Sequence, residues 1–202
     1  DIIIPSTVNW RGWHVFDSCI NLTNVTLQNG LSQVNLGAFY NCSALPNITI
    51  PSGVKRIHNY TFTYCDNLTL VQLPNTIETI GEKAFAYTVS LPSITIPSSC
   101  QRIEDYAFRG SSITEVCFDG NVREICRGGF YNCYALPSIT LPPTLLYIAD
   151  FLLYNCSNLT YMYIPPSVQR IGESAISYCV LLPSVEIPPS NQRINISAFR
   201  YC

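Results

Sequence analysis

The sequence is poor in charge, histidine and methionine, and it contains no long apolar run. Only 12% of its 202 residues are charged, with 11 Lys and Arg against 13 Asp and Glu, and it has two histidines and one methionine. The net charge of −2 excludes the basic surface expected of a nucleic-acid-binding protein. No apolar run approaches the length of about 18 residues that a membrane helix needs, so no segment is expected to span a bilayer. A hydrophobic fraction of 48% excludes an intrinsically disordered chain.

Signatures of catalysis and of metal binding are also missing. The chain has no Cys-x-x-Cys pair, no cluster of Cys with His, and no glycine-rich phosphate loop after a predicted strand. His14 lies close to Asp17, but a Ser/His/Asp site needs a convergent pocket that proximity in sequence does not provide. We expect His14 and His58 at the surface. The sequence predicts neither enzymatic activity nor a bound cofactor or metal ion.

The ten cysteines reveal a repeat. One position of the repeat, which we call the cysteine slot, recurs every 23 residues, with a single interval of 22. Seven cysteines occupy this slot, and Thr88 and Ser111 occupy it in the two units without cysteine. Phe recurs three positions before the slot, and Leu, Ile or Val recur three, six, eight and fifteen positions after it. A fixed period of this size is typical of a solenoid. The cysteines in the slot are Cys19, Cys42, Cys65, Cys133, Cys156, Cys179 and Cys202.

Each column of the repeat has a structural interpretation. The apolar positions six and eight after the slot alternate like a strand, and the proline that follows them ends strand pairing. A second extended segment is expected around residues 54–57, and a short helical turn around residues 80–87. We predict a β-rich solenoid of about nine right-handed coils, with one parallel sheet, helical turns at the convex corner and a continuous spine of Phe rings. Residues 1–202 form one array without separate domains.

The pattern IxxxAFxxCxxLxxIxIPxxVxxI resembles the BspA-like leucine-rich repeat family. The segments Ile77–Pro97 and Val168–Pro188 carry the match, and the resemblance covers essentially the whole chain. It implies a leucine-rich-repeat solenoid in a surface-exposed or secreted protein with a role in adhesion or in binding host proteins. It also implies that the repeat itself is not catalytic. The departures are Leu153 and Ile176 in the Phe column and Arg11 in the first unit.

Neither end of the sequence shows a polar capping repeat, which a solitary solenoid needs to cover its terminal core. Two interpretations follow. The array is a segment of a longer protein, or its open ends stack on further copies of itself and propagate a filament.

The cysteines are expected to fill the core rather than to react. Thiols in the repeated slot lie on successive rungs and behave as small apolar side chains. Cys100 is predicted in the core, Cys117 pointing outward, and the orientation of Cys126 is open. No disulfide is predicted.

Nine asparagines lie in Asn-x-Ser/Thr motifs, more than random placement gives. They indicate either a secreted glycoprotein with N-glycans or consensus turn residues that bond to their own backbone. They are Asn21, Asn24, Asn41, Asn47, Asn59, Asn67, Asn155, Asn158 and Asn195.

The outward face of the strands is the default binding surface of such an array. Most of its predicted side chains are small and hydroxylated, and Tyr161 and Tyr163 beside Glu186 form the only aromatic cluster. These three residues are the candidate ligand-binding site, because Tyr is enriched at interaction hot spots. The alternative is that Tyr is an ordinary strand-forming residue. Asn24 and Asn47 lie on the same face, where glycans would obstruct binding.

We therefore predict a non-catalytic segment of an extracellular or cell-surface adhesion protein that recognises a protein or a glycan. The alternative is a structural, N-glycosylated filament built by end-to-end stacking of uncapped arrays. Neither function involves nucleic acid or a membrane span within this segment.

Overall fold

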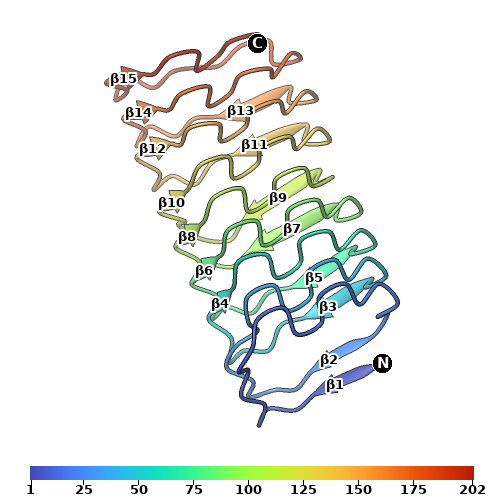
Figure 1. The fold of residues 1–202 in the computed structure, drawn as a ribbon. Coiled ribbons are helices and arrows are strands. Elements are labelled where there is room, and N and C mark those ends of the chain that lie inside the picture. Colours follow the sequence, from blue (N-terminus) through green and yellow to red (C-terminus); the bar gives the residue numbers. More distant parts are fainter.

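A computed structural model describes residues 1–202. Two ladders of short parallel strands run along the length of the molecule (Figure 1). Most coils contribute one strand to the first ladder and a two-residue strand to the second. The first ladder contains β1 (Ile2–Ile4), β2 (Val25–Leu27), β3 (Asn47–Thr49), β5 (Leu70–Gln72), β7 (Ser93–Ile96), β9 (Glu115–Phe118), β11 (Ser138–Thr140) and β13 (Tyr161–Tyr163). The second contains β4 (Arg56–Ile57), β6 (Thr79–Ile80), β8 (Arg102–Ile103), β10 (Glu124–Ile125), β12 (Tyr147–Ile148), β14 (Arg170–Ile171) and β15 (Arg193–Ile194).

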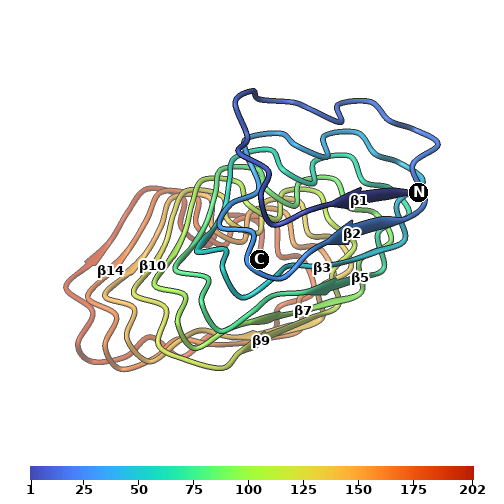
Figure 2. The same cartoon turned by 90° about the horizontal axis from the view of Figure 1, so that it is seen from below.

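The predicted solenoid is confirmed. Paired strands are parallel and in register one repeat apart, as in Ile48 opposite Val71 and Ile80 opposite Ile103. Seen from below, successive coils lie over one another around a shared interior (Figure 2). The first ladder has eight strands rather than nine, because the segment 184–187 forms no strand.

The first ladder is not the single sheet that we expected. It divides into four two-stranded sheets, β1–β2, β3–β5, β7–β9 and β11–β13. Prolines explain the division, since β3 lies between Pro46 and Pro51 and has no amide hydrogen at either end to donate to the coil before it. The next coil has Thr69 where β3 has Pro46, and its amide and hydroxyl both donate to the Pro46 carbonyl, at 2.9 and 3.0 Å. The same proline pairs flank β7, β11 and the strandless segment, at Pro92 and Pro97, Pro137 and Pro142, and Pro183 and Pro188.

The corner between the second ladder and the cysteine slot consists of turns, so the predicted helical turns are wrong. Lys83 and Tyr87 have φ of 50° and 59°, in the left-handed region that interrupts an α-helix. Amides along this corner alternate between two acceptors. The Phe85 amide donates to the Ala107 carbonyl of the next coil at 2.8 Å, whereas the Ala84 amide donates within its own coil to Gly81 at 3.2 Å.

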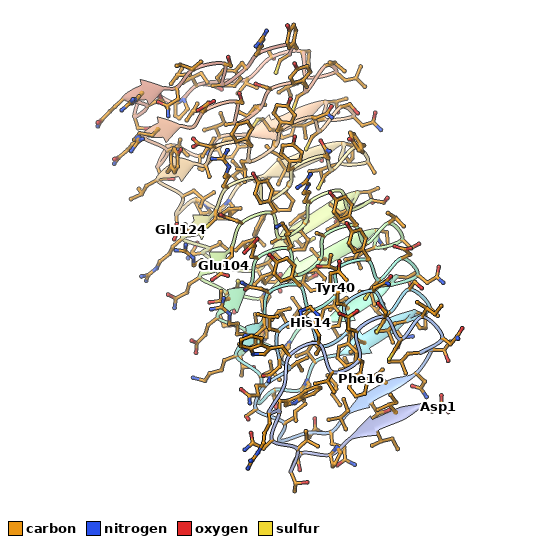
Figure 3. The ribbon with its side chains drawn as sticks, viewed as in Figure 1. Asp1, His14, Phe16, Tyr40, Glu104 and Glu124 are labelled. Carbon is orange, nitrogen blue, oxygen red and sulfur yellow. The ribbon has the colours of Figure 1, made fainter.

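The predicted aromatic spine runs through the core. Consecutive Phe rings are stacked with centroids 5.3–5.8 Å apart and planes within 16° of parallel. Figure 3 shows Phe16 at the first rung, inside the coil. Leu153 and Ile176 continue the column as fully buried aliphatic side chains. In the short unit, Ile113 is fully buried and takes the place of the missing leucine. The stacked rings are Phe16, Phe39, Phe62, Phe85, Phe108 and Phe130.

All ten cysteines are free thiols. Cys100 is fully buried and Cys117 exposed, as predicted, and Cys126 is buried. Burial raises the pKa of Cys42 and of Cys133 to about 12, because the thiolate would lose its hydration in the core.

The second ladder is interrupted between β10 and β12, which belong to different sheets. The amides of Gly81, Glu104 and Gly172 each donate to an Ile carbonyl of the preceding coil at 2.8 Å, but the equivalent amide, Ala149, has no such bond. A hollow of about 720 Å³ lies at this open rung. Contacts resume on both sides of it, where Thr144 Oγ1 donates to the Val122 carbonyl at 2.6 Å and the Gly128 amide donates to Asp150 at 3.0 Å.

Candidate functional site

Strand β13 presents two tyrosines to solvent. Strand alternation buries Met162 in the core, where it is 5% exposed, and turns its neighbours Tyr161 and Tyr163 outward, where they are 56% and 43% exposed. The adjacent strand β11 has the small residues Ser138 and Thr140 at the paired positions. The two rings therefore stand above their surroundings.

A groove of about 500 Å³ lies between β13 and the segment 183–189 of the next coil. Both tyrosines and Glu186 line it, so the structure brings together the three residues predicted from the sequence. Glu186 is exposed and makes no ion pair. The groove is lined by Thr160, Tyr161, Met162, Tyr163, Ile164, Pro166, Pro183, Ser184, Glu186, Pro188 and Pro189. Its four prolines restrict the motion of the walls, because proline has a fixed φ.

The rest of the first ladder's outer face is mostly small and polar. The proline-flanked strands β3, β7 and β11 carry only Asn, Ser and Thr outward. Among the other strands, β5 has an exposed Leu70, 51% accessible, beside Gln72. The only place where two exposed aromatic side chains and a free carboxylate meet is the groove beside β13.

The nine Asn-x-Ser/Thr asparagines divide into two groups. Asn41, Asn59, Asn155 and Asn195 are half-buried, and the first three bond to neighbouring coils. The Asn59 carbonyl oxygen accepts from the Glu82 amide at 3.2 Å, for example. The exposed group, whose side chains make no hydrogen bond, is Asn21, Asn24, Asn47, Asn67 and Asn158.

Two further clusters were missed at the level of sequence. The open rung has Arg102, which pairs with Glu124, and Arg123, which has no carboxylate partner. Figure 3 shows Glu104 and Glu124 on this side of the stack. On the corner turns, Arg109 and Arg127 face a second hollow. The signal that could have located the latter is the pair Arg109 and Gly110, because Gly110 stands where the preceding unit has Tyr87 and Arg109 stands where the following unit has Tyr131.

The histidines take part in local contacts. His14 Nδ1 lies 3.0 Å from Asp17 Oδ2 at the surface, and its ring packs edge-on to Tyr40 at 5.7 Å between centroids. His58 is half-buried, and burial lowers its pKa. No three His, Cys, Asp or Glu side chains gather in a geometry that could hold a metal ion. The structure has no helix with the length and apolar character required to cross a bilayer.

Coils of this length, with Leu, Ile and Phe in fixed slots and parallel ladders between them, define a leucine-rich-repeat solenoid. The family model for the BspA type leucine rich repeat region matches residues 1–110 and 78–202, with six copies of the repeat. The chain belongs to the BspA-type leucine-rich repeat family, whose repeats are generally non-catalytic scaffolds. No curated protein matches the sequence.

Solved structures with the same fold come from several bacteria. A leucine-rich repeat protein from Bacteroides ovatus is 28% identical over all of this chain, with a TM-score of 0.83. The chain spans 61% of that protein's length. A leucine-rich repeat protein of T. pallidum is 24% identical over 91% of this chain and 78% of its own, with a TM-score of 0.64. A leucine rich cell surface protein from Faecalibacterium prausnitzii is 24% identical over 98% of this chain and 69% of its own, with a TM-score of 0.54.

Proposed function

We propose that this chain is a recognition segment of an extracellular or cell-surface adhesion protein, and that it binds a protein ligand through the groove beside β13. The observation that carries the proposal is the convergence of Tyr161, Tyr163 and Glu186 on one groove with proline walls. Exposed tyrosines supply contact area at a low cost in side-chain entropy. Membership of a scaffold family, and a similar protein described as a cell surface protein, support the location.

The chemistry of the groove specifies what the ligand offers. Two ring faces and the proline walls favour an apolar or aromatic side chain of the ligand at the centre of the contact. The unpaired carboxylate of Glu186 favours a Lys or Arg at its edge. A ligand segment with a hydrophobic anchor next to a basic residue satisfies both.

The test is binding of the purified protein to a panel of extracellular-matrix and cell-surface proteins, measured by biolayer interferometry. We expect the variant with Tyr161→Ala and Tyr163→Ala to bind the wild-type ligand at least about 30-fold more weakly, because one hot-spot side chain contributes about 2 kcal/mol. Leu70→Ala is the matched control, since it removes an exposed outward side chain from the same face at β5. A double variant that binds every ligand with wild-type affinity would overturn the proposal.

The second candidate, a structural filament coated with N-glycans, draws its support from the five exposed asparagines that make no side-chain hydrogen bonds. Asn24 and Asn47 flank or lie in strands of the first ladder, so glycans there would obstruct binding over the first repeats. Electron microscopy of material from the natural source distinguishes the two functions, since continuous filaments favour the structural one.

A further inference from the structure

A ladder of tyrosine rings covers the corner turns, and it is interrupted at one rung. Tyr64 and Tyr87 stack with centroids 4.9 Å apart, and Tyr131 and Tyr154 stack at 4.8 Å. Between these pairs the short unit has Gly110, whose φ is +66° and where a Cβ atom would lie 2.7 Å from the Tyr87 ring. No tyrosine ring stands at this position, and the ladder has a gap.

The guanidinium of Arg109 occupies the gap. Its central carbon lies 5.7 Å from the ring centroid of Tyr87, 5.2 Å from Tyr131 and 5.6 Å from Tyr106. Three aromatic rings therefore hold the group through cation–π contacts and fix its orientation. Its Nε is buried without a hydrogen-bond acceptor, and no carboxylate lies within ion-pair distance. Because this guanidinium is held in place and has no anionic partner, it is positioned to bind an anion.

A second guanidinium lies beside the first. Arg127 Nε donates to the Tyr106 hydroxyl at 3.0 Å, and its guanidinium lies 4.5 Å from the ring centroid of Phe151. The carboxylates nearest to it are otherwise engaged or more distant. Asp105 accepts from the Arg127 amide at 3.1 Å, and Asp150 accepts from the Tyr147 hydroxyl at 2.6 Å and from the Glu173 amide at 2.8 Å. Neither Asp150 nor Glu173 forms an ion pair with Arg127.

A hollow of about 240 Å³ opens between the two guanidiniums, lined by Tyr106, Arg109, Arg127, Tyr131 and Phe151. We propose that this hollow binds an acidic sugar residue, with its carboxylate or sulfate group between Arg109 and Arg127 and its ring against the aromatic side chains. A planar guanidinium suits an oxyanion, and the Tyr131 and Phe151 rings that line the hollow supply an apolar boundary for the sugar ring. The hollow is smaller than pockets for drug-sized ligands, which start at about 300 Å³, so it holds no more than one sugar ring. This site lies on the corner turns and is independent of the groove beside β13.

The experiment is isothermal titration calorimetry with four probes, namely a hexuronic acid tetrasaccharide, its sulfated form, its carboxyl-reduced neutral form and a poly-glutamate peptide. We expect the acidic sugars to bind and the neutral sugar to be silent, and the two acidic forms reveal whether carboxylate or sulfate is preferred. Arg109→Gln and Arg127→Gln are each expected to weaken binding about tenfold or more, since each removes a charge-assisted hydrogen-bond donor.

Arg193→Gln is the matched control, because Arg193 is exposed, lies on β15 and makes no ion pair. Arg109→Gln can also loosen the tyrosine ladder, so Arg127→Gln, at an exposed side chain, provides the second measurement, with thermal unfolding of both variants as a check on the fold. Equal binding of the neutral sugar, binding of the peptide alone, or wild-type affinity in Arg127→Gln would each overturn the proposal.

Discussion

The cysteine slot illustrates how one repeated side chain can fill the core and satisfy the backbone as well. The Cys65 thiol donates to the Phe39 carbonyl at 3.1 Å, and Cys156 makes the same bond to Phe130 at 3.2 Å. Where the slot holds Thr88, the hydroxyl bonds within its own coil instead, at 2.9 Å. The sequence predicts the burial of these thiols from their period, but a column of identical residues does not reveal which carbonyl each one reaches.

The Phe column permits a direct test at one residue. Phe85 is fully buried and stacks on the rings before and after it, and Leu153 occupies the same slot further along the chain. We expect Phe85→Leu to lower the free energy of unfolding by less than about 1.5 kcal/mol and Phe85→Ala to lower it by about 3–5 kcal/mol, because only the second leaves a large cavity. Urea titrations followed by circular dichroism measure both. Equal losses would show that ring stacking, rather than filled volume, sets the stability of the column.

At the scale of the strand, two prolines in the sequence determine which strands pair, and only the proline after the strand was interpreted in this way from the sequence. A proline after the strand is predicted to stop pairing, and β3, β7 and β11 each end just before one. The second proline, four residues after the slot, recurs in every other unit as Pro46, Pro92, Pro137 and Pro183 and alternates with threonine. It makes the hydrogen-bonded unit two coils long, whereas the apolar side chains repeat with every coil. Hydrogen bonding depends on which amides exist, whereas apolar periodicity depends only on which side chains are buried.

The open rung between β10 and β12 makes a prediction about backbone amides. Leu146 and Ala149 donate to no carbonyl, whereas Gln169 and Gly172, one coil later, donate to Leu146 and Ile148 at 2.9 and 2.8 Å. We expect the first two amides to exchange with deuterium at least about tenfold faster than the last two, since exchange requires breaking a hydrogen bond. Exchange measured residue by residue by NMR tests this directly. Equal protection would mean that the ladder closes over the open rung in solution.

At the scale of the whole molecule, the sequence was sufficient for the core and for one of the candidate sites. The groove beside β13 followed from outward positions on neighbouring coils, because a strict repeat places those residues side by side. The hollow of Arg109 and Arg127 did not follow, because it depends on a departure from the repeat. Gly110 admits the Tyr87 ring and leaves room for Arg109 beside it. The repeat pattern therefore does not predict the side chains of this irregular unit, and the second candidate site lies there.

Four buried thiols make the stability of the whole array depend on pH, because burial raises the pKa of each of them. The pKa of Cys100 rises to about 11, and those of Cys42, Cys126 and Cys133 rise to about 12, from an ordinary value of 9.0. Below pH 9 these thiols are protonated in both the folded and the unfolded chain, and their contribution to stability is fully present. Above pH 9 the unfolded chain loses these protons while the folded chain retains them, so stability falls as pH rises.

We therefore expect unfolding at alkaline pH. Between pH 9 and about 11 each such thiol lowers the free energy of unfolding by about 1.4 kcal/mol per pH unit. The measurement is a series of urea titrations from pH 7 to 11 on the wild type and on Cys133→Ser, whose slope against pH above 9 should be shallower by that amount. Cys117→Ser is the control, because Cys117 is exposed and the rise in its pKa is smaller, so its removal should change the slope less than Cys133→Ser does. A slope unchanged in Cys133→Ser would show that the core thiols ionise without unfolding the array.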